Sequence, residues 1–524
     1  ALASVLGVGE GHLLHRETRW VGSRYFAKSE SLFQSFLRGV QSRRNRIILY
    51  RIFMSIFELL LTEIDHSRSS TEPMYVQLAK AISSAINSGR VRPGERLPPH
   101  RELASRLNVN ITTITRTMSM LQEANLVDTR PGRGTVVCTP PPDLRLRGAQ
   151  FQPASTTIAG LIDLSINRPA TDAYNHVLAS ILPELPSDPR FSSMKDYHLS
   201  EGPVWAREAA ASWLRSMGVS ASAPQIVICE GAQHGLSLVL RAITKPGETI
   251  LADEVTYQGI SSLCRTLGLN IVGVGSDARG MLPSALEQAC AEHSARLVFI
   301  VSSIHCPTAV TLDEERGDEL LKIIRKHDLL LLEDDVYRPI SDEAQRPLVC
   351  RYPEHTIYVS SMSKCIAPGL RIGFILTPPS LIVDIIDSIR VNCWSISPLS
   401  ALIATCLIES GRARDLVIVQ REELRARQAL LRTHLTGLKF NSSATAPHAW
   451  LQLPDHWSGE AFCQACLDNG IIILPGSAFS LSHEREPNAV RINLSAAPSR
   501  EKLEHALGVI ARLIRQTPTS APND

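Results

Sequence analysis

A lysine that follows three serines offers groups for binding a phosphate and for forming an imine. The segment 360–364 reads Ser-Ser-Met-Ser-Lys, and the apolar residues before it predict a buried strand. Open α/β sheets bind ligands at such strand ends. Hydroxyl groups and the guanidinium of Arg371 are phosphate ligands by type, and Lys364 can form a Schiff base if its pKa is lowered. Taken alone, the segment is more typical of a polar turn with a solvated lysine.

A second buried run, residues 329–332, is followed by carboxylates and a tyrosine. Asp334 comes directly after Glu333, and Tyr337 follows three residues later. Pyridoxal phosphate (PLP) needs a lysine to carry its aldehyde and a carboxylate to keep its ring nitrogen protonated. A phenol can bind the 3-oxygen of the ring. The two strand ends together therefore predict a PLP site, although Asp334 alone could be a helix cap or a solvated acid.

Residues from about 160 to the C-terminus resemble fold-type I PLP enzymes of the aspartate aminotransferase superfamily. The resemblance implies that Lys364 forms the Schiff base, Asp334 pairs with the ring nitrogen and Tyr337 binds the 3-oxygen. It further implies a phosphate site. The expected phosphate ligands are Ser361, Ser363, Arg371 and the predicted helix start Gly231, Ala232 and Gln233, whose N–H groups suit an anion.

Four more residues match positions near the cofactor or substrate in that superfamily. Tyr257 matches the aromatic that stacks on the ring, with plain packing as the alternative. Tyr197 matches the tyrosine that reaches the phosphate of a neighbouring subunit, which implies a homodimer; the alternative is a core tyrosine. Arg491 would clamp the α-carboxylate of a substrate, or be a surface arginine on a strand. Asn167 lies where the superfamily places residues near the substrate.

The segment 305–309 departs from the superfamily pattern. The superfamily has Asn-Pro-Thr-Gly, whereas this chain has Cys306 at the asparagine position and Ala309 at the glycine position. A thiol is a weak hydrogen-bond donor, and His305 precedes the matching position. We therefore expect less efficient transamination but not a loss of cofactor binding.

Residues 72–138 predict a helix, a second short helix, a turn, a third helix and a β-hairpin. Apolar residues recur at helical spacing from Tyr75 to Ile86, and further helices are predicted at 100–107 and 111–124. Asn110 can cap the third helix. Nine Lys and Arg against five acids give this segment a formal charge of +4 (9 − 5), more than the +2 of the whole chain. Such a local basic face favours DNA.

This segment resembles the winged helix of GntR-type regulators in its Tyr75-x-Gln-Leu and Arg101-Glu-Leu-Ala motifs and in its glycine-bearing hairpin. Position by position, the resemblance implies DNA contacts at Arg101, Thr112, Thr113, Arg116 and Arg133. The alternatives are solvated arginines or a protein-binding winged helix. The third helix begins with Ile111, where the family usually has arginine. Isoleucine cannot read guanine with two hydrogen bonds but can touch a thymine methyl.

Composition favours a reduced cytoplasmic protein. The 524 residues suffice for two or three domains, and the eleven cysteines show no disulfide framework. Cys463 and Cys466 form the one CxxC pair, which we interpret as two core-facing residues of a helix. No apolar run reaches the ~18–20 residues that span a bilayer, so we expect no membrane association. We find no metal-ligand set.

Residues 1–71 form a basic extension. Its composition is typical of an organellar transit peptide or a nucleic-acid arm, but we expect it not to be native, with the natural start nearer Met54 or Met74. Residues 139–160 are proline-rich and polar, and we interpret them as a linker. After Arg371 we expect helices to about residue 420, and the apolar run 471–474 predicts a strand.

The predicted protein has several domains: a mostly α winged helix-turn-helix at 72–138, and at 161–524 an α/β PLP-dependent transferase of fold type I with a smaller α+β C-terminal lobe. This order resembles the MocR-type subfamily of GntR regulators. It implies a transcriptional regulator that binds an operator in double-stranded DNA, and an amine or amino acid effector that exchanges with Lys364 on PLP. The alternatives are an active aminotransferase with an accessory winged helix, and a DNA-binding protein whose second domain holds no cofactor.

Overall fold

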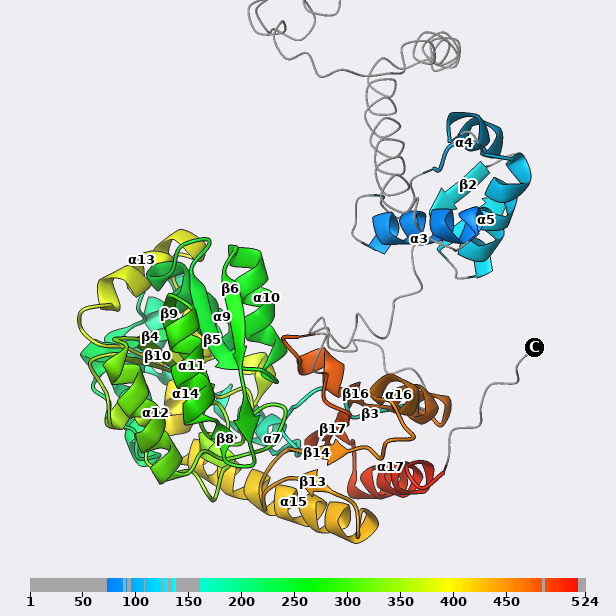
Figure 1. Ribbon diagram of the computed structural model, residues 1–524. Coiled ribbons are helices and arrows are strands. Elements are labelled where there is room, and N and C mark those ends of the chain that lie inside the picture. The colour runs from blue at the N-terminus through cyan, green and yellow to red at the C-terminus, as the bar shows by residue number, and fades with distance from the viewer. Residues whose placement is uncertain are drawn as a thin grey trace, which may run out of the picture. The chain divides into compact units, whose positions relative to one another are not determined.

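The computed structural model describes residues 73–87, 91, 96–107, 109–123, 126–130, 134–137, 161–482 and 486–516. The chain divides into two compact units, residues 1–143 and 144–524. Each unit is described by itself below (Figure 1).

The described residues of the first unit form three helices and one hairpin around a single core. Its elements are α3 (Met74–Asn87), α4 (His100–Arg106), α5 (Ile111–Glu123), β1 (Val127–Arg130) and β2 (Gly134–Val137). The two strands pair antiparallel, with Val127 opposite Val137. Leu78, Leu103 and Ile114 bring the three helices together in the core. These elements confirm the predicted helices, and the predicted cap is present: the Thr112 N–H donates to Asn110 Oδ1 at 3.0 Å.

The second unit is built on a seven-stranded sheet with the strand order β4-β12-β11-β10-β9-β5-β6. All neighbouring strands are parallel except that β12 runs antiparallel to β4 and β11. The strands are β4 (Ile226–Cys229), β5 (Thr249–Asp253), β6 (Asn270–Val274), β9 (Ala295–Val301), β10 (Leu330–Asp334), β11 (Thr356–Ser361) and β12 (Gly373–Leu376).

Helices pack on both faces of this sheet, which explains why its central strands are apolar almost throughout. Strand residues such as Phe299 and Ile357 share one cluster with Leu236 and Ile385 of the helices, whereas Tyr358, the next residue along β11, belongs to another. The helices are α7 (Ala173–Ile181), α8 (Val204–Ser216), α9 (Ala232–Ile243), α10 (Gln258–Leu267), α11 (Pro283–Glu292), α12 (Glu314–Lys326), α13 (Ile382–Asn392) and α14 (Pro398–Glu409). A hairpin, β7 (Ser276–Asp277) and β8 (Gly280–Met281), follows β6.

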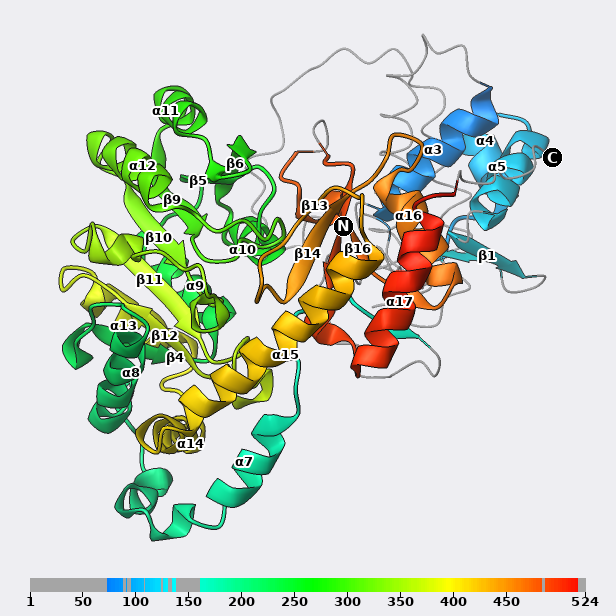
Figure 2. The same cartoon turned by 90° about the horizontal axis from the view of Figure 1, so that it is seen from below.

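A smaller lobe follows the long helix α15 (Arg412–His434), which Figure 2 shows in yellow running from α14 toward α17. Its four-stranded sheet has the order β13-β14-β17-β16. The strands are β13 (Phe440–Asn441), β14 (His448–Gln452), β16 (Leu474–Pro475) and β17 (Ala489–Asn493), and the helices are α16 (Gly459–Asp468) and α17 (Arg500–Leu513). A separate parallel pair joins β3 (Ile162–Asp163) to β15 (Ile471–Ile472).

The structure corrects two predictions about elements. Sequence reasoning expected only helices from Arg371 to about 420, but β12 follows at once and completes the sheet between β4 and β11. The run 471–474, predicted as one strand, is divided between β15 and β16, which belong to different sheets. In both places the strands are short and are defined by pairing with residues distant in the sequence. The local apolar pattern does not contain that information.

Candidate functional site

Lys364 and Asp334 are placed by neighbouring parallel strands. Asp334 is the last residue of β10 and lies opposite Val359 of β11, and Lys364 follows three residues after the end of β11. The Nζ atom of Lys364 donates to the main-chain oxygen of Asn167 at 2.9 Å. Burial lowers the pKa of Lys364 to about 8, because a low-dielectric site disfavours the charged amine. An amine with such a pKa is available as a nucleophile near neutral pH.

The Asp334 carboxyl is buried, and its Oδ1 has no hydrogen-bond partner among the described residues. Burial, and then the nearby Asp335 charge, raise its pKa to about 7. An N–H cation placed at Oδ1 would satisfy the oxygen and favour the ionised carboxylate. The protonated ring nitrogen of PLP supplies that kind of group, so the residue present fits the cofactor.

Gly231 and Arg371 form a cradle at the start of α9. Gly231 has φ +82°, and a Cβ there would lie 3.1 Å from Nη2 of Arg371. Arg371 has a left-handed φ of 54°, and its Nη2 donates to the Glu230 oxygen at 2.5 Å. The first N–H groups of α9, at Ala232 and Gln233, have no intrahelical acceptor by the geometry of a helix start. Bare N–H groups beside an arginine suit a phosphate.

Of the two serines predicted as phosphate ligands, Ser361 is the last residue of β11 and Ser363 lies on the turn that follows. The Ser363 N–H donates to Ser361 Oγ at 3.0 Å, which fixes that hydroxyl next to the lysine. Ser361 is buried and Ser363 is half-buried. The structure therefore brings the serines, Lys364 and Arg371 into one loop, and their roles as cofactor ligands stay predictions.

Tyr337 and Asn167 meet beside the lysine. The Nδ2 of Asn167 donates to the Tyr337 hydroxyl oxygen at 2.6 Å and lies 3.1 Å from Nδ1 of His448. Nε2 of His448 lies 3.1 Å from the His305 oxygen. Sequence reasoning missed His448, because a buried histidine on a strand looks like any core residue until its partners are known.

Arg491 is buried at the end of this group and is held by the segment that departs from the superfamily pattern. Its Nη1 donates to Cys306 Sγ at 3.3 Å, and Nη2 donates to the main-chain oxygen of Ser165. The ring of Phe479 lies 4.6 Å below the guanidinium carbon. Nε has no partner among the described residues. The Nε–H therefore remains available for a ligand, and each terminal nitrogen carries a second hydrogen beyond the bond described.

The two other predicted tyrosines differ in exposure. Tyr257 is half-buried at the start of α10, and its hydroxyl donates to Gln233 Oε1 at 2.9 Å, next to the cradle. Burial raises the pKa of Tyr257 above its ordinary range. Tyr197 is 88% exposed and contacts the ring of Trp394, with centroids 5.8 Å apart. The alternative of a core tyrosine is therefore wrong for position 197.

The candidate DNA contacts lie on α4 and α5. Arg101, Thr112 and Arg116 are exposed and Thr113 is half-buried. The guanidinium of Arg116 lies over the ring of Tyr75, 5.8 Å from its centroid, which orders that side chain. Arg133 lies outside the described residues.

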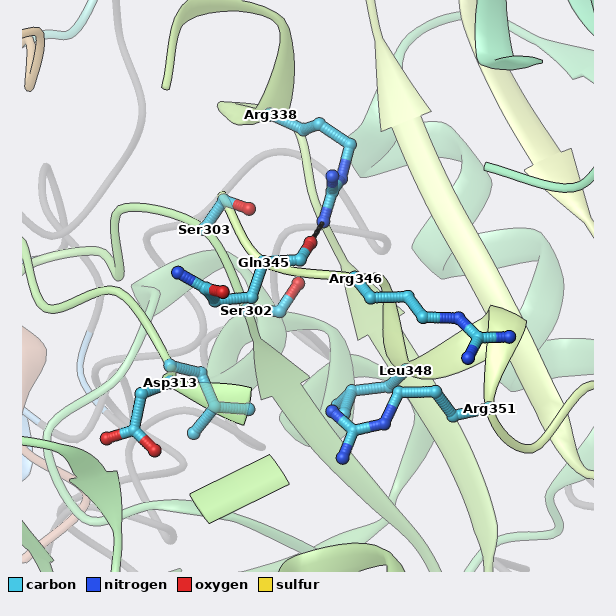
Figure 3. A pocket seen from close by; sticks show the side chains of 9 residues that line it. Ser302, Ser303, Asp313, Arg338, Gln345, Arg346, Leu348 and Arg351 are labelled. Carbon is cyan, nitrogen blue, oxygen red and sulfur yellow. Dashed lines mark hydrogen bonds between the residues drawn. The ribbon is translucent and has the colours of Figure 1, made fainter. Parts of the chain in front are cut away.

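A small polar pocket lies beside the loop after β9 (Figure 3). The Arg338 guanidinium donates to the Gln345 oxygen at 2.6 Å, as the dashed line shows, and Arg351 pairs with Asp318. Ser302 on its wall donates to Glu333 at 2.7 Å. Because these polar groups already have partners within the protein, the pocket offers them poorly to a ligand.

Two further checks concern metals and membranes. Among the described residues, no group of three or more His, Cys, Asp or Glu side chains could hold a metal ion. None of the described helices combines the length and the hydrophobicity that crossing a membrane requires. Of the CxxC pair, Cys466 is buried and Cys463 packs against the same core cluster.

Two family models match the chain. The model for aminotransferase class I and II matches residues 159–510, and the model for bacterial regulatory proteins of the gntR family matches residues 74–137.

Relatives resemble the chain over both units. YdeF of Bacillus subtilis, an uncharacterized HTH-type transcriptional regulator, is 26% identical over 84% of this chain and 95% of its own length. The HTH-type transcriptional regulator TauR of Rhodobacter capsulatus is 25% identical over 84% of this chain and 96% of its own length. PtsJ of Salmonella typhimurium, a vitamin B6 salvage pathway transcriptional repressor, is 26% identical, covering 80% and 94%.

Solved structures share the fold of the second unit. An archaeal alanine:glyoxylate aminotransferase has a TM-score of 0.64 at 24% identity, covering 71% of this chain and 94% of its own. The kynurenine aminotransferase of Pyrococcus horikoshii, solved with PMP, has a TM-score of 0.65 at 21% identity, covering 69% and 93%. These matches confirm the predicted transferase fold.

Proposed function

Given that the chain belongs to the class I and II aminotransferase family through residues 159–510, we propose that it is a PLP-binding transcriptional regulator. Its winged helix would bind operator DNA, and its transferase unit would sense an amine or amino acid. The observation that carries the proposal is a gntR-type module and an aminotransferase unit in one chain, an order shared with relatives that are named as regulators. Because operator DNA lies in the bacterial cytoplasm, the proposal places the protein there.

The residues around Lys364 would hold the cofactor. Lys364 would bind the aldehyde, Asp334 the ring nitrogen and Tyr337 the 3-oxygen. The phosphate would be bound by Ser361, Ser363, Arg371 and the α9 start at Gly231, Ala232 and Gln233, and Tyr257 would contact the ring. When bound, PLP supplies an electrophilic imine carbon with which a primary amine can react. The orphaned Asp334 oxygen and the glycine that leaves room for Arg371 support this assignment.

The effector would be recognised beside the lysine. Arg491 offers a buried guanidinium whose Nε has no partner among the described residues, which suits a carboxylate. The main-chain oxygen of Asn167 accepts a hydrogen bond from Lys364, and its amide nitrogen contacts Tyr337. An amino acid with a free carboxylate fits this pair better than a simple amine. Its binding changes DNA affinity only as far as it prefers one arrangement of the protein over another.

A second copy of the chain would complete the site. Tyr197 projects from the surface next to Trp394, and Val391, three residues before Trp394, is 89% exposed. Exposed aromatic and aliphatic groups of this kind mark protein interfaces. We propose a homodimer in which Tyr197 reaches the phosphate of the partner, as the superfamily resemblance implies.

The second candidate function is an active aminotransferase. The fold and the lysine favour it, and Cys306 argues against it. The Cys306 sulfur accepts a hydrogen bond from Arg491 at 3.3 Å. A thiol there is a poor donor to the 3-oxygen of PLP. We therefore rank the regulator first.

Three measurements test the proposal. Borohydride reduction of the PLP-loaded protein followed by peptide mapping should label Lys364, and Lys364→Ala should stay unlabelled. Binding-site selection from random DNA should return an operator whose affinity changes with an amino acid in the wild type but not in Lys364→Ala. Incubation with amino acids and a 2-oxo acid separates the rivals: repeated turnover would establish the enzyme, whereas a DNA response without turnover supports the regulator.

A further inference from the structure

Three buried side chains form a hydrogen-bonded chain next to Lys364: His448, Asn167 and Tyr337. Their exposed fractions are 0%, 5% and 3%. His448 Nε2 lies 3.1 Å from the His305 oxygen, and its Nδ1 lies 3.1 Å from Asn167 Nδ2. Asn167 Nδ2 donates to the Tyr337 oxygen at 2.6 Å. Buried polar groups generally need a hydrogen-bond partner within the protein. The amide nitrogen of Asn167 has such partners here, whereas its Oδ1 is buried without a partner among the described residues.

The main-chain carbonyl of His305 determines which ring nitrogen of His448 carries the proton. The His305 main-chain oxygen can only accept, so Nε2 of His448 must carry the hydrogen. Burial, and then the positive charge of Arg491, lower the pKa of His448 to about 3, so the ring is neutral. A neutral ring with its proton on Nε2 has a bare Nδ1, which can only accept.

The bare Nδ1 then fixes the orientation of the Asn167 amide. Turned the other way, Oδ1 of Asn167 would face Nδ1 of His448, which would place two acceptors against each other. The NH₂ group therefore faces the ring, and its second hydrogen goes to the Tyr337 oxygen.

Since the Tyr337 oxygen accepts from Asn167, its own hydrogen points to a third group. Burial raises the pKa of Tyr337 well above its ordinary range, so the hydroxyl keeps that hydrogen. The main-chain oxygen of Asn167 meanwhile accepts from Lys364. One asparagine thus orients both the phenol and the amine.

We propose that His448 is a positioning residue that acts through Asn167 to aim the Tyr337 hydroxyl hydrogen at the 3-oxygen of PLP. This compensates for Cys306, which stands where the superfamily has an asparagine donor. The inference rests on the proposed binding of PLP at Lys364. The orientation of Tyr337 would then depend on the smaller lobe, because His448 is the first residue of β14 in that lobe. His305 and Tyr337 instead follow strands of the large sheet.

The test measures the pH midpoint at which the lysine-bound cofactor loses its proton. The absorbance of the cofactor reports this titration. A hydrogen bond to the 3-oxygen favours the deprotonated, more negative form. Removing it should therefore raise the pH midpoint, by about one pH unit. We expect this rise in His448→Phe and in Tyr337→Phe, with no additional rise in the double variant.

Partial rescue separates positioning from packing. His448→Asn keeps an acceptor oxygen near the Nδ1 position, so most of the wild-type midpoint should return. Should His448→Phe fail to fold, Asn167→Ser decides, because it removes the amide N–H from Tyr337 and should raise the midpoint as Tyr337→Phe does. His434→Asn is the matched control, since this residue lies on α15 and contacts Glu504 at 3.6 Å; its midpoint should stay unchanged.

Two results would overturn the inference while leaving PLP binding intact. One is a wild-type midpoint in His448→Phe when Tyr337→Phe is shifted. The other is a fully additive double variant. A wild-type protein without any lysine-bound cofactor absorbance would instead overturn the proposed function, and the inference with it.

Discussion

At the scale of single residues, Asp334 carries a carboxyl group whose burial costs stability. Its carboxyl is buried, with one oxygen unpartnered among the described residues. Folding must therefore either protonate the group or bury a charge. A site that needs a ligand to satisfy its own polar groups lowers the stability of the free protein, and such sites are where function costs stability.

We expect Asp334→Asn to stabilise the cofactor-free protein in a pH-dependent way. The folded pKa of about 7 lies above the ordinary 3.8, so the unfolded carboxyl ionises first as pH rises. The wild type loses stability progressively from pH about 4 to 7 and then levels off, at a cost of at most roughly 4 kcal/mol. The gain of the variant in thermal midpoint should thus be small at pH 4 and largest above pH 7.

The same variant should bind PLP poorly, because a neutral amide cannot stabilise a protonated ring nitrogen. Thermal scans of the cofactor-free proteins from pH 4 to 8 provide the measurement. Asp342→Asn serves as the control, since that carboxylate is exposed and paired with Arg425. A stability gain in Asp334→Asn that does not vary with pH would contradict the account.

Ala309 has a strained backbone conformation. It stands where the superfamily has glycine, and its φ is 57°. A Cβ in left-handed backbone costs about 1 kcal/mol. We expect Ala309→Gly to raise the free energy of unfolding by about that amount, measured by thermal or urea unfolding. Ala289→Gly, in the helix α11, is the opposite control and should destabilise.

At the scale of elements, we expect α5 to determine which bases the first unit reads in DNA. Ile111 is 43% exposed, and Thr112, Thr115 and Arg116 are also exposed. The Thr115 hydroxyl donates to the Ile111 oxygen at 2.9 Å, so it is not available for a base. The N-terminal residues of a recognition helix contact base edges, and those of α5 present mainly methyl groups.

We expect the selected operator to carry thymines opposite the start of α5. Replacing such a thymine with uracil removes only its methyl, which should weaken binding by ~0.8 kcal/mol, roughly fourfold. Ile111→Ala should lose that sensitivity, whereas Gln122→Ala, at the far end of α5, should keep it. Equal affinity for the uracil and thymine operators, measured by titration at fixed salt, would contradict this contact.

Elements with a strong period were predictable from sequence, and short pairings were not. The helices α3 and α5, and strands such as β9 and β10, are indicated by their apolar spacing. Strand β12 has only four residues, and nothing local distinguishes it from the start of a helix. In the site, Lys364 and Asp334 were found because each follows a long buried strand. His448 was not found, because its role depends on partners 143 and 281 residues away.

At the scale of the whole molecule, the outward surface around Tyr197 predicts association. Leu199 and Val204 are also more than half exposed there. We expect Val391→Glu to weaken the homodimer and, with it, cofactor affinity, because the partner's tyrosine would leave the phosphate. Light scattering would report the mass, and PLP titration the affinity.

Ile418→Glu on α15 is the matched control, an exposed aliphatic residue on a different element. It should leave both quantities unchanged. A monomeric wild type with full PLP affinity would refute the shared site.

The pairing of Ser361 with Gly373 closes the base of a loop that carries both Lys364 and Arg371. The Lys364 amine and the Arg371 guanidinium therefore belong to one loop whose ends are joined by the pairing of β11 with β12. If other parts of the sheet shift, we expect these two side chains to move together, with little change in the distance between them. If Lys364 and Arg371 bind PLP as proposed, this short loop determines the distance between the groups that bind its aldehyde and its phosphate.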